Sequence, residues 1–297
     1  MPDWMGDGDI AFPFLGIYLE NVPKTFTVFG ITIALYGLII GIGMILAFVL
    51  ITHVAKKNGL DPDDFYDMGM WLIIFGIIGA RIYYVIFSWD YYKNNLGEII
   101  NLRQGGLAIY GGVIAGFTAL IVWCRVKKKS ICKMGDVAFM GVLVGQIMGR
   151  WGNFTNREVF GGYCDNIFAM RLPISAVRSR DISEELASHI VDGTNYIQVH
   201  PTFLYESFYN LVLLSLIYIF FKKKAFDGEA ILWYLGGYGI GRFIIEGIRT
   251  DRLLIPGTGL AVSQLLGISL FAISLAIDII VRVKQKNGGE KSKQANA

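Results

Sequence analysis

The stretch FTVFGITIALYGLIIGIGMILAFVLI, residues 26–51, contains no charged residue. A helix needs about 20 mostly apolar residues to cross the hydrocarbon core of a bilayer, so this run is long enough to span it. Six other stretches reach a similar length, namely 69–89, 106–125, 135–154, 202–221, 229–248 and 261–281. The sequence therefore predicts an all-α polytopic membrane protein with about seven transmembrane helices.

The composition favours the same class of protein. Only 17% of the residues are charged, against roughly 25% in soluble domains. The net charge of +3 comes from short basic clusters between apolar runs, which offer no continuous face to nucleic acid. The cysteines Cys124, Cys132 and Cys164 are too few and too scattered for a disulfide framework or a CxxC metal site, and are interpreted as structural. The acidic N-terminal segment lacks the basic region of a cleavable signal peptide, so the first hydrophobic helix is expected to direct insertion.

Lysine and arginine favour the cytoplasmic side of a membrane, and they cluster in alternate connections of this chain. The clusters are Lys56 and Lys57; Arg125, Lys127, Lys128, Lys129 and Lys133; Lys222, Lys223 and Lys224; and Arg282, Lys284, Lys286, Lys291 and Lys293. We expect residues 1–297 to form a single integral membrane domain. The basic clusters place its N-terminus outside and the tail 284–297 in the cytoplasm, and the composition of this tail predicts disorder. The long connection 155–201 then lies outside, and its alternating run 168–172 predicts a small extracytoplasmic head with some β structure.

The even-numbered predicted spans each carry an arginine next to glycine, in Gly79-Ala80-Arg81, Gly149-Arg150 and Gly241-Arg242. Each arginine lies about 12 to 15 residues from the cytoplasmic end of its span, hence roughly 18 to 23 Å deep at 1.5 Å per residue. An arginine inside the bilayer costs about 2.5 to 3.5 kcal/mol on insertion scales and is therefore a functional hypothesis. The planar donors of guanidinium suit a phosphodiester, which favours an anionic lipid headgroup as ligand. Alternatively, each arginine reaches the interface or pairs with a carboxylate that ties helices together. Of the three arginines, Arg81 is the one for which this structural role is most expected.

Other polar residues are expected in the same outer half of the membrane. Glu246 and Asn153 share helix faces with Arg242 and Arg150, respectively. His200, before Pro201, is either a helix-entry residue or a catalytic one. The glycine pairs of the third span are interpreted mainly as close-packing surfaces between helices. The odd-numbered spans bring further side chains to that depth: Tyr36, Tyr110, Tyr205, Glu206 and Gln264.

The run GRWGNFTNREVFG, residues 149–161, closely resembles the signature of the prolipoprotein diacylglyceryl transferase family. HPTFLYE at 200–206 resembles its HP-x-x-LYE element, and YGIGR at 238–242, with Glu246 and Arg249, resembles its Y-x-x-x-R-x-x-x-E-x-x-R element. LYG at 35–37 and GAR at 79–81 match shorter elements of the first and second spans. The resemblance extends over about residues 30–275, in the correct order, and several long motifs in order are highly specific.

The resemblance implies transfer of the diacylglyceryl group of phosphatidylglycerol to the lipobox cysteine sulfur in the signal peptide of a prolipoprotein, at a bacterial cytoplasmic membrane, with release of glycerol phosphate. The catalytic candidates it implies are Arg150, Arg242, Glu246, Tyr110, Glu206 and His200. The substrate-binding candidates are Arg150, Asn153, Glu158, Gly161, Tyr36, Tyr238, Arg81, Arg249 and Gln264. Neither a metal nor a soluble cofactor is expected, because the cluster lacks paired His or Asp ligands and no phosphate-cradling loop follows a strand.

One position departs from the family pattern, because Tyr110 stands where many members have a histidine that opens the third span. Tyrosine, with a pKa near 10, is a poor general base at neutral pH. The identity of the general base therefore stays open. Glu206, His200 or a water molecule could accept the thiol proton, or the electropositive field of the arginines could lower the pKa of the thiol. A transporter or lipid-binding protein without chemistry is the alternative; it would show inverted repeats and discontinuous helices. Another lipid-modifying enzyme, such as an acyltransferase, would lack the 149–161 signature.

Overall fold

The computed structural model describes residues 4–102, 105–250, 252, 254–255 and 257–295, with side chains up to residue 287. The chain is mostly helical and carries two small β-sheets. It divides into two compact units. Unit 1 comprises residues 1–47, 140–225 and 232–297, and unit 2 comprises residues 48–139 and 226–231.

Within the described residues, six helices are long and apolar enough to cross a membrane. They are α1 (Leu35–Lys57), α2 (Pro62–Phe87), α4 (Ile109–Val126), α5 (Ile131–Asn156), α7 (Thr202–Phe220) and α9 (Val262–Ala295). Apolar side chains such as Ile45, Ile86 and Ile219 are more than half exposed, the reverse of the pattern on a soluble helix, so lipid is the environment that suits them. The structure thus supports a multi-pass membrane protein.

The seventh expected span coincides with a helix, α8 (Glu229–Glu246), that is not among those six. Its 18 residues include Glu229, Arg242 and Glu246, and these three charges lower its hydropathy. Length and composition therefore support six spans in the described part of the chain, whereas the sequence predicted about seven. Both acidic side chains are buried within the protein.

Residues 26–34 form a β-hairpin, so the prediction that the first span begins at residue 26 was wrong. β3 (Thr25–Val28) pairs with β4 (Ile31–Ala34), and α1 begins only at Leu35. Phe29 and Gly30 between the strands have positive φ angles of 50° and 79°, as a two-residue turn of the mirror-image type requires. The flanking residues are mainly β-branched or aromatic and alternate with threonine, a pattern that favours strand pairing.

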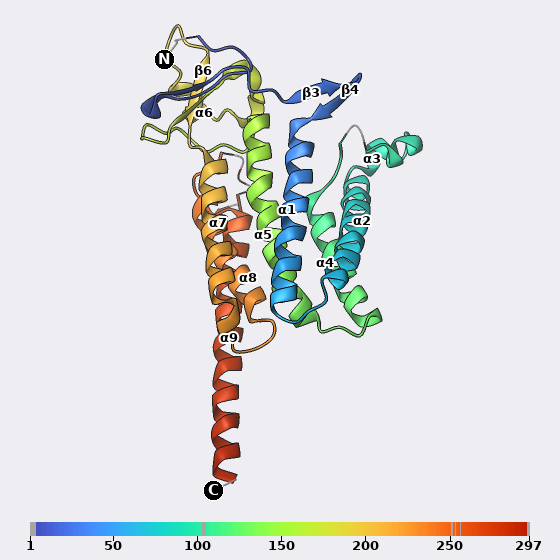
Figure 1. Cartoon of the computed structure of the whole chain (residues 1–297). Helices are drawn as coiled ribbons and strands as arrows, with labels where there is room; N and C mark the ends of the chain where they lie inside the picture. The colour runs from blue at the N-terminus through green and yellow to red at the C-terminus, as the bar shows by residue number, and fades with distance from the viewer. Residues whose placement is uncertain (1–3, 103–104, 251, 253, 256, 296–297) are drawn as a thin grey trace. The chain divides into compact units, whose positions relative to one another are not determined.

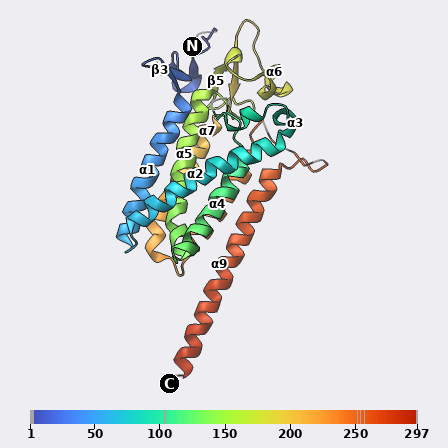
Figure 2. The same ribbon diagram turned by 90° about the vertical axis from the view of Figure 1, so that its right-hand side faces the viewer.

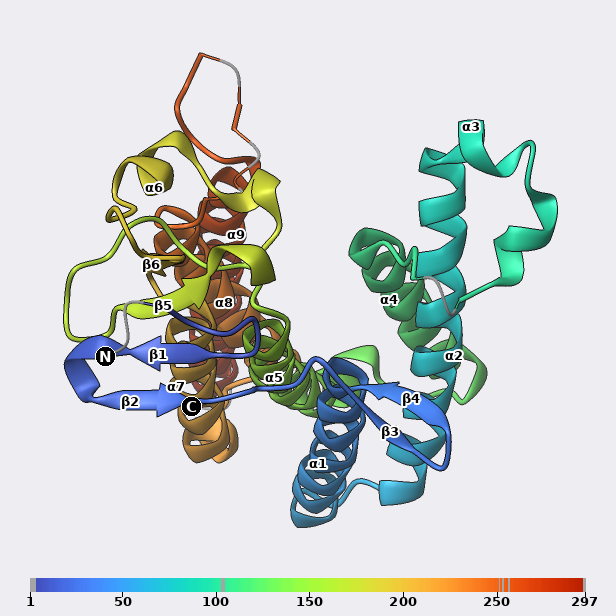
Figure 3. The ribbon, with the colours of Figure 1, turned by 90° about the horizontal axis from the view of Figure 1, so that it is seen from above.

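The expected β structure of the 155–201 head is present in unit 1, and the N-terminal segment completes it. The antiparallel sheet has the order β2 (Ile17–Leu19), β1 (Ile10–Phe12), β5 (Met170–Pro173), β6 (Tyr196–Val199), as seen from above in Figure 3. Ile10, Leu172 and Ile197 form part of its buried core, over which α6 (Glu184–Ser188) packs. No feature of the sequence predicted that residues 10–19 pair with this head.

Arg157 fastens the N-terminal segment to the head. Its buried guanidinium donates hydrogen bonds to the carbonyl oxygens of Thr155 (3.0 Å), Gly8 and Val22 (2.6 Å). The nearby Asp9 carboxylate is buried, which by itself would raise its pKa, but hydrogen bonds from Tyr18 and from the backbone of Asn21 and Gly6 lower the pKa overall.

In unit 2, α2 and α4 lie side by side (Figure 2) and meet through glycines. A Cβ added at Gly79 would lie 2.7 Å from the Gly111 carbonyl oxygen, and one added at Gly111 would lie 2.3 Å from that of Gly79. Neither position has room for a side chain, which supports the close-packing interpretation of these glycines. The loop between the two helices contains α3 (Trp89–Tyr92) and the 3-10 turn η2 (Leu96–Ile100). The other 3-10 turns are η1 (Pro13–Leu15), η3 (Ile174–Ala176), η4 (Ser179–Asp181) and η5 (Phe221–Lys223).

The C-terminal helix α9 continues to Ala295 and ends as the long red helix of Figure 1. Disorder was the prediction for the tail 284–297, and it was wrong for 284–295; residues 296–297 lie outside the described part. Lysine, glutamine, glutamate and alanine are good helix formers, and they extend a helix that has already begun within the apolar segment.

Candidate active site: arginines around two buried carboxylates

Three segments of unit 1 that are distant in sequence meet at Gly161. The Gly161 amide donates to the His200 carbonyl (3.0 Å), the His200 amide donates to Gly162 (3.0 Å), and the Gly162 amide donates to Ile248 (2.9 Å). A Cβ added at Gly161 would lie 2.7 Å from both the His200 Cβ and the Ile248 carbonyl oxygen. Only glycine fits there, so this position fixes how the signature segment meets the 200–206 and 246–249 motifs.

The turn before Gly161 has a strained backbone. Arg157 and Val159 have φ angles of 55° and 59°, in a region that a β-branched residue rarely enters. The Thr202 hydroxyl donates to the Val159 carbonyl, and the Arg157 guanidinium donates to the Gly8 and Val22 carbonyls of the N-terminal segment. Such strain persists only where surrounding contacts over-determine the conformation, as they often do at functional sites.

Glycines on α8 bring that helix close to its neighbours in unit 1. A Cβ added at Gly241 would lie 2.3 Å from the Tyr209 ring of α7, and one added at Gly239 would lie 2.4 Å from the Gly267 carbonyl oxygen of α9. The Tyr209 hydroxyl also donates to the Gly237 carbonyl (2.6 Å). These contacts fix α8 and therefore the position of its Arg242 side chain.

Glu206 on α7 is the centre of the polar cluster. Its side chain is only 3% exposed, and its carboxylate oxygens lie 2.9 Å from Arg150 Nε, 3.4 Å from Arg242 Nη1 and 4.0 Å from Arg249 Nη1. The second buried carboxylate, Glu246, accepts a hydrogen bond from Arg242 Nη2 and lies 3.7 Å from Arg249 Nη1. Five charged side chains from three helices and a following turn thus form one network.

The network carries an excess of positive charge, because three guanidinium groups face two carboxylates. The arginine side chains Arg150, Arg242 and Arg249 are only 19%, 18% and 12% exposed. Electrostatic attraction is stronger where water is largely excluded, so a buried cationic cluster of this kind attracts an anion. The ion pairs also tie helices together, as the alternative interpretation of the arginines expected; the two roles are compatible.

Asn153 extends the cluster toward the head. It accepts a hydrogen bond from Arg150 Nη1 (3.2 Å) and donates one to Glu158 Oε1 (3.0 Å). Glu158 also lies 3.8 Å from the Arg178 guanidinium of the head. Tyr36 at the start of α1 lies against Gly152, where an added Cβ would be 2.5 Å from the ring. The signature residues are therefore linked by contacts as well as by sequence.

His200 lies just before α7, and Tyr205 lies in the first turn of that helix. Their Nδ1 and hydroxyl oxygen are 3.2 Å apart. Burial lowers the pKa of His200 below its usual value of 6.5, so its imidazole is neutral at pH 7. A neutral imidazole has one nitrogen that can accept a proton.

Arg81 belongs to unit 2 and makes a different set of contacts. All its N–H groups point at backbone carbonyls: Nε donates to Ile99 (2.7 Å), Nη1 to Gly105 and Gly106 (2.9 Å each), and Nη2 to Glu98 (2.6 Å) and Asn101 (3.1 Å). The side chain fixes the loop that leads into α4. These contacts favour a structural role over phosphate binding.

Three other candidates have defined surroundings. Gln264 accepts from the Ala261 amide (3.0 Å) and donates to the Phe243 carbonyl (3.2 Å), so it caps α9 and joins it to α8. The Tyr238 ring stacks on Tyr234 with centroids 5.7 Å apart. Tyr110 belongs to unit 2, where its exposed ring lies 6.5 Å from that of Tyr83.

Sequence reasoning assigned no role to Arg157 or Asp136, although both are buried and hydrogen-bonded. Asp136, on α5, accepts from the Gly228 amide (2.8 Å) and the Ile231 amide (3.1 Å) at the start of α8. The sequence does show Asp136 as an acidic residue within the apolar stretch 135–154, which could have marked it as a buried polar contact. Arg157 was visible within the signature, but its partners on residues 8 and 22 were not.

Comparison with known proteins agrees with the motifs. A sequence model of the prolipoprotein diacylglyceryl transferase family matches residues 23–280. Proteins named phosphatidylglycerol–prolipoprotein diacylglyceryl transferase from Finegoldia magna and Lysinibacillus sphaericus are each 40% identical, over 88% and 91% of this chain and 94% and 96% of their own length. The protein of that name from Clostridioides difficile is 40% identical over 82% of this chain and 90% of its own. The chain therefore belongs to the prolipoprotein diacylglyceryl transferase family.

Proposed function

We propose that this protein transfers the diacylglyceryl group of phosphatidylglycerol to the lipobox cysteine of a prolipoprotein, the first step of bacterial lipoprotein maturation. Family membership and the names of the relatives support the reaction. The observation that carries the assignment of the site is the convergence of Arg150, Arg242 and Arg249 on the buried Glu206. This makes the protein a transferase that acts on a lipid within the membrane.

The proposed step is a substitution at the glycerol carbon that bears the phosphate ester. The substrate thiolate forms a C–S bond at this carbon, the C–O bond to the phosphate breaks, and its electron pair stays on the phosphate oxygen. The products are a thioether and glycerol phosphate. Because negative charge accumulates on the departing phosphate, Arg150 and Arg242 lower the barrier by stabilising it there.

Glu206 and Glu246 act in this scheme as positioning residues. Both carboxylates are bound by guanidinium groups, so they hold Arg150, Arg242 and Arg249 in place. A donor already in place when charge develops needs no reorganisation during the reaction. Asn153, fixed between Arg150 and Glu158, is placed to bond the phosphate or the headgroup glycerol.

His200 is the side chain best suited to take the thiol proton. Its imidazole is neutral because burial lowers its pKa, and it belongs to the segment that Gly161 holds against the signature. Glu206 is less suited, since three arginines surround it. The nearby cations assist by favouring the thiolate of the substrate.

The basic clusters and the apolar helices support a proposed membrane arrangement. We place the protein in the bacterial cytoplasmic membrane with α8 as a seventh, polar span, its charged face against other helices. The N-terminus and head lie outside and the C-terminus in the cytoplasm. Phosphatidylglycerol enters from the outer leaflet, and the signal peptide with its lipobox cysteine approaches through the membrane.

The decisive experiment incubates purified protein with phosphatidylglycerol radiolabelled in its acyl chains and a lipobox peptide. Label on the peptide is expected, and changing the peptide's cysteine to serine should abolish it. A matched sample of the Arg242→Gln variant should leave the peptide unlabelled while eluting as a folded protein. Movement of labelled lipid across vesicles without peptide labelling would instead support the transporter alternative.

A further inference from the structure

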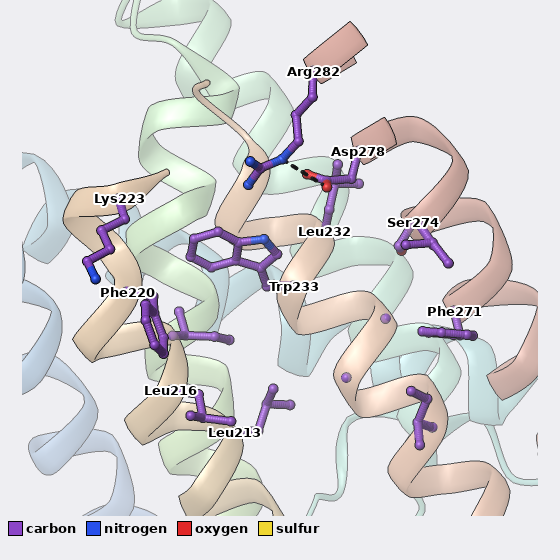
Figure 4. A pocket seen from close by; sticks show the side chains of 15 residues that line it. Leu213, Leu216, Phe220, Lys223, Leu232, Trp233, Phe271, Ser274, Asp278 and Arg282 are labelled. Atoms are coloured by element: carbon purple, nitrogen blue, oxygen red, sulfur yellow. Dashed lines mark hydrogen bonds and ion pairs between the residues drawn. The ribbon is translucent and has the colours of Figure 1, made fainter. Parts of the chain in front are cut away.

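A second feature of unit 1 is an apolar groove between α7, α8 and α9. It encloses about 590 Å³, within the usual range for small-molecule sites of roughly 300 to 1,000 Å³. Figure 4 shows Leu213 and Leu216 of α7 and Phe271 of α9 at one end of the groove. Gly236 and Gly237 of α8 also line it and contribute no side chain at these two positions.

The opposite end of the groove is basic and aromatic. Lys223 of η5 and Arg282 of α9 flank it, and the Trp233 indole lies between them in Figure 4. Arg282 Nε donates to Asp278 Oδ2 at 3.1 Å, which fixes the guanidinium at the rim. Lys223 Nζ lies 5.2 Å from the centroid of the Phe220 ring. Long apolar walls that end in cations match the shape and charge of an anionic phospholipid.

The groove is distinct from the arginine cluster, because the two use different faces of α8. Trp233, Gly236 and Ile240 line the groove at helical spacing. Tyr234, Tyr238 and Arg242 lie four residues apart on another face. Ile240 and Arg242 are two residues apart, hence about 200° around the helix axis at 3.6 residues per turn. A lipid held at the cluster therefore does not account for the groove.

We propose that this groove binds one anionic phospholipid of the cytoplasmic leaflet. An acyl chain lies between α7, α8 and α9, and the phosphate lies between Lys223 and Arg282. The leaflet follows from the membrane orientation proposed above, in which these basic ends face the cytoplasm. Basic pockets between transmembrane helices on this side are a recurrent way to bind anionic headgroups, and tryptophan favours the same interfacial depth.

The test uses the full-length protein in nanodiscs of phosphatidylcholine that contain a small fraction of photoactivatable lipid, with no peptide substrate. The reactive group is at the end of an acyl chain, and the headgroup is either phosphatidylglycerol or phosphatidylcholine. Mass spectrometry of the crosslinked peptides should locate phosphatidylglycerol at Leu213–Leu216 and Phe271–Leu275. Each basic side chain is expected to contribute about fivefold to this labelling, so the Lys223→Gln/Arg282→Gln double variant should lose about 25-fold.

Two matched variants make the result specific. Lys284→Gln removes the same charge from α9 at a residue that does not line the groove, and labelling should persist. Arg150→Lys should slow transfer by about 10²- to 10³-fold yet leave groove labelling intact, so this proposal and the proposed reaction fail independently. Equal labelling by both lipids, labelling unaffected in the double variant, or crosslinks only to a second copy of the chain would each overturn the proposal.

Discussion

Replacing Arg150 with lysine tests the central role assigned to guanidinium geometry. The arginine uses different nitrogens for its two protein partners, Nε for Glu206 at 2.9 Å and Nη1 for Asn153 at 3.2 Å. Both contacts, and a bond to phosphate, need several donors in one rigid plane. Lysine keeps the positive charge but has a single nitrogen on a flexible stem, so it cannot reproduce this arrangement.

The expected loss follows from removing one preorganised donor to the developing phosphate charge. Such losses lower kcat by about 10²- to 10³-fold, equivalent to about 2.7 to 4 kcal/mol. The carboxylate of Glu206 keeps two other arginines within 4.0 Å, so folding should be little affected. The assay measures kcat and KM for a lipobox peptide, with thermal unfolding in detergent as the folding control. A fall in kcat would show that Arg150 stabilises the transition state. A role in substrate binding alone would raise KM and leave kcat unchanged.

Arg178→Lys is the matched control, since this half-exposed head arginine lies outside the three-arginine cluster. It should retain activity within about threefold, as exposed ion pairs contribute about 0 to 1 kcal/mol. If Arg150→Lys turns over at a near-normal rate while folded, charge alone is sufficient and the assignment of a donor fork to Arg150 is wrong.

Three further predictions test the surroundings of the cluster. Gly161→Ala should lower the free energy of unfolding by about 1 to 3 kcal/mol through overpacking and should reduce transfer. Gly162→Ala should do neither, because a Cβ at this position meets no atom within 4 Å. Equal effects of the two variants would contradict the inference that only glycine fits at position 161. Arg81→Lys can keep at most three of five hydrogen bonds, so it should lose roughly 3 kcal/mol or more in unfolding measurements, while exposed Arg125→Lys should be neutral. Because burial lowers the pKa of His200, wild-type kcat/KM should fall only as the pH drops below 6.5, when the imidazole becomes protonated. His200→Asn should be slow and lack this acid limb between about pH 5 and 8, and an unchanged profile would exclude His200 as the base.

The sequence was sufficient for the class of protein and for most of its helices. Apolar runs of membrane-spanning length are local, and lipid requires each such segment to satisfy its own backbone hydrogen bonds, so helices follow directly. The first span was the exception. Residues 26–34 are as apolar as a helix would be, but β-branched residues and the Phe29-Gly30 turn make them a hairpin.

The residue types of the cluster were also visible in the sequence, because a charge within an apolar run is rare and expensive. Arg150, Arg242, Glu206 and Glu246 stood out on that ground. The sequence favoured Arg81 as the structural member of the three, but it could not show which groups Arg81 contacts. Arg81 fits the same pattern, yet its guanidinium donates to backbone carbonyls of residues 98, 99, 101, 105 and 106.

Tertiary structure alone decided which segments meet. Gly161 contacts residues 200 and 248, and Arg157 reaches residues 8 and 22, separations that no local pattern encodes. The sequence by itself determined an apolar helical membrane protein with costly buried charges, because solvent preference and helix formation depend on neighbouring residues. The excess positive charge at one point depends on packing between distant helices, and only the folded chain brings those side chains within ion-pair distance.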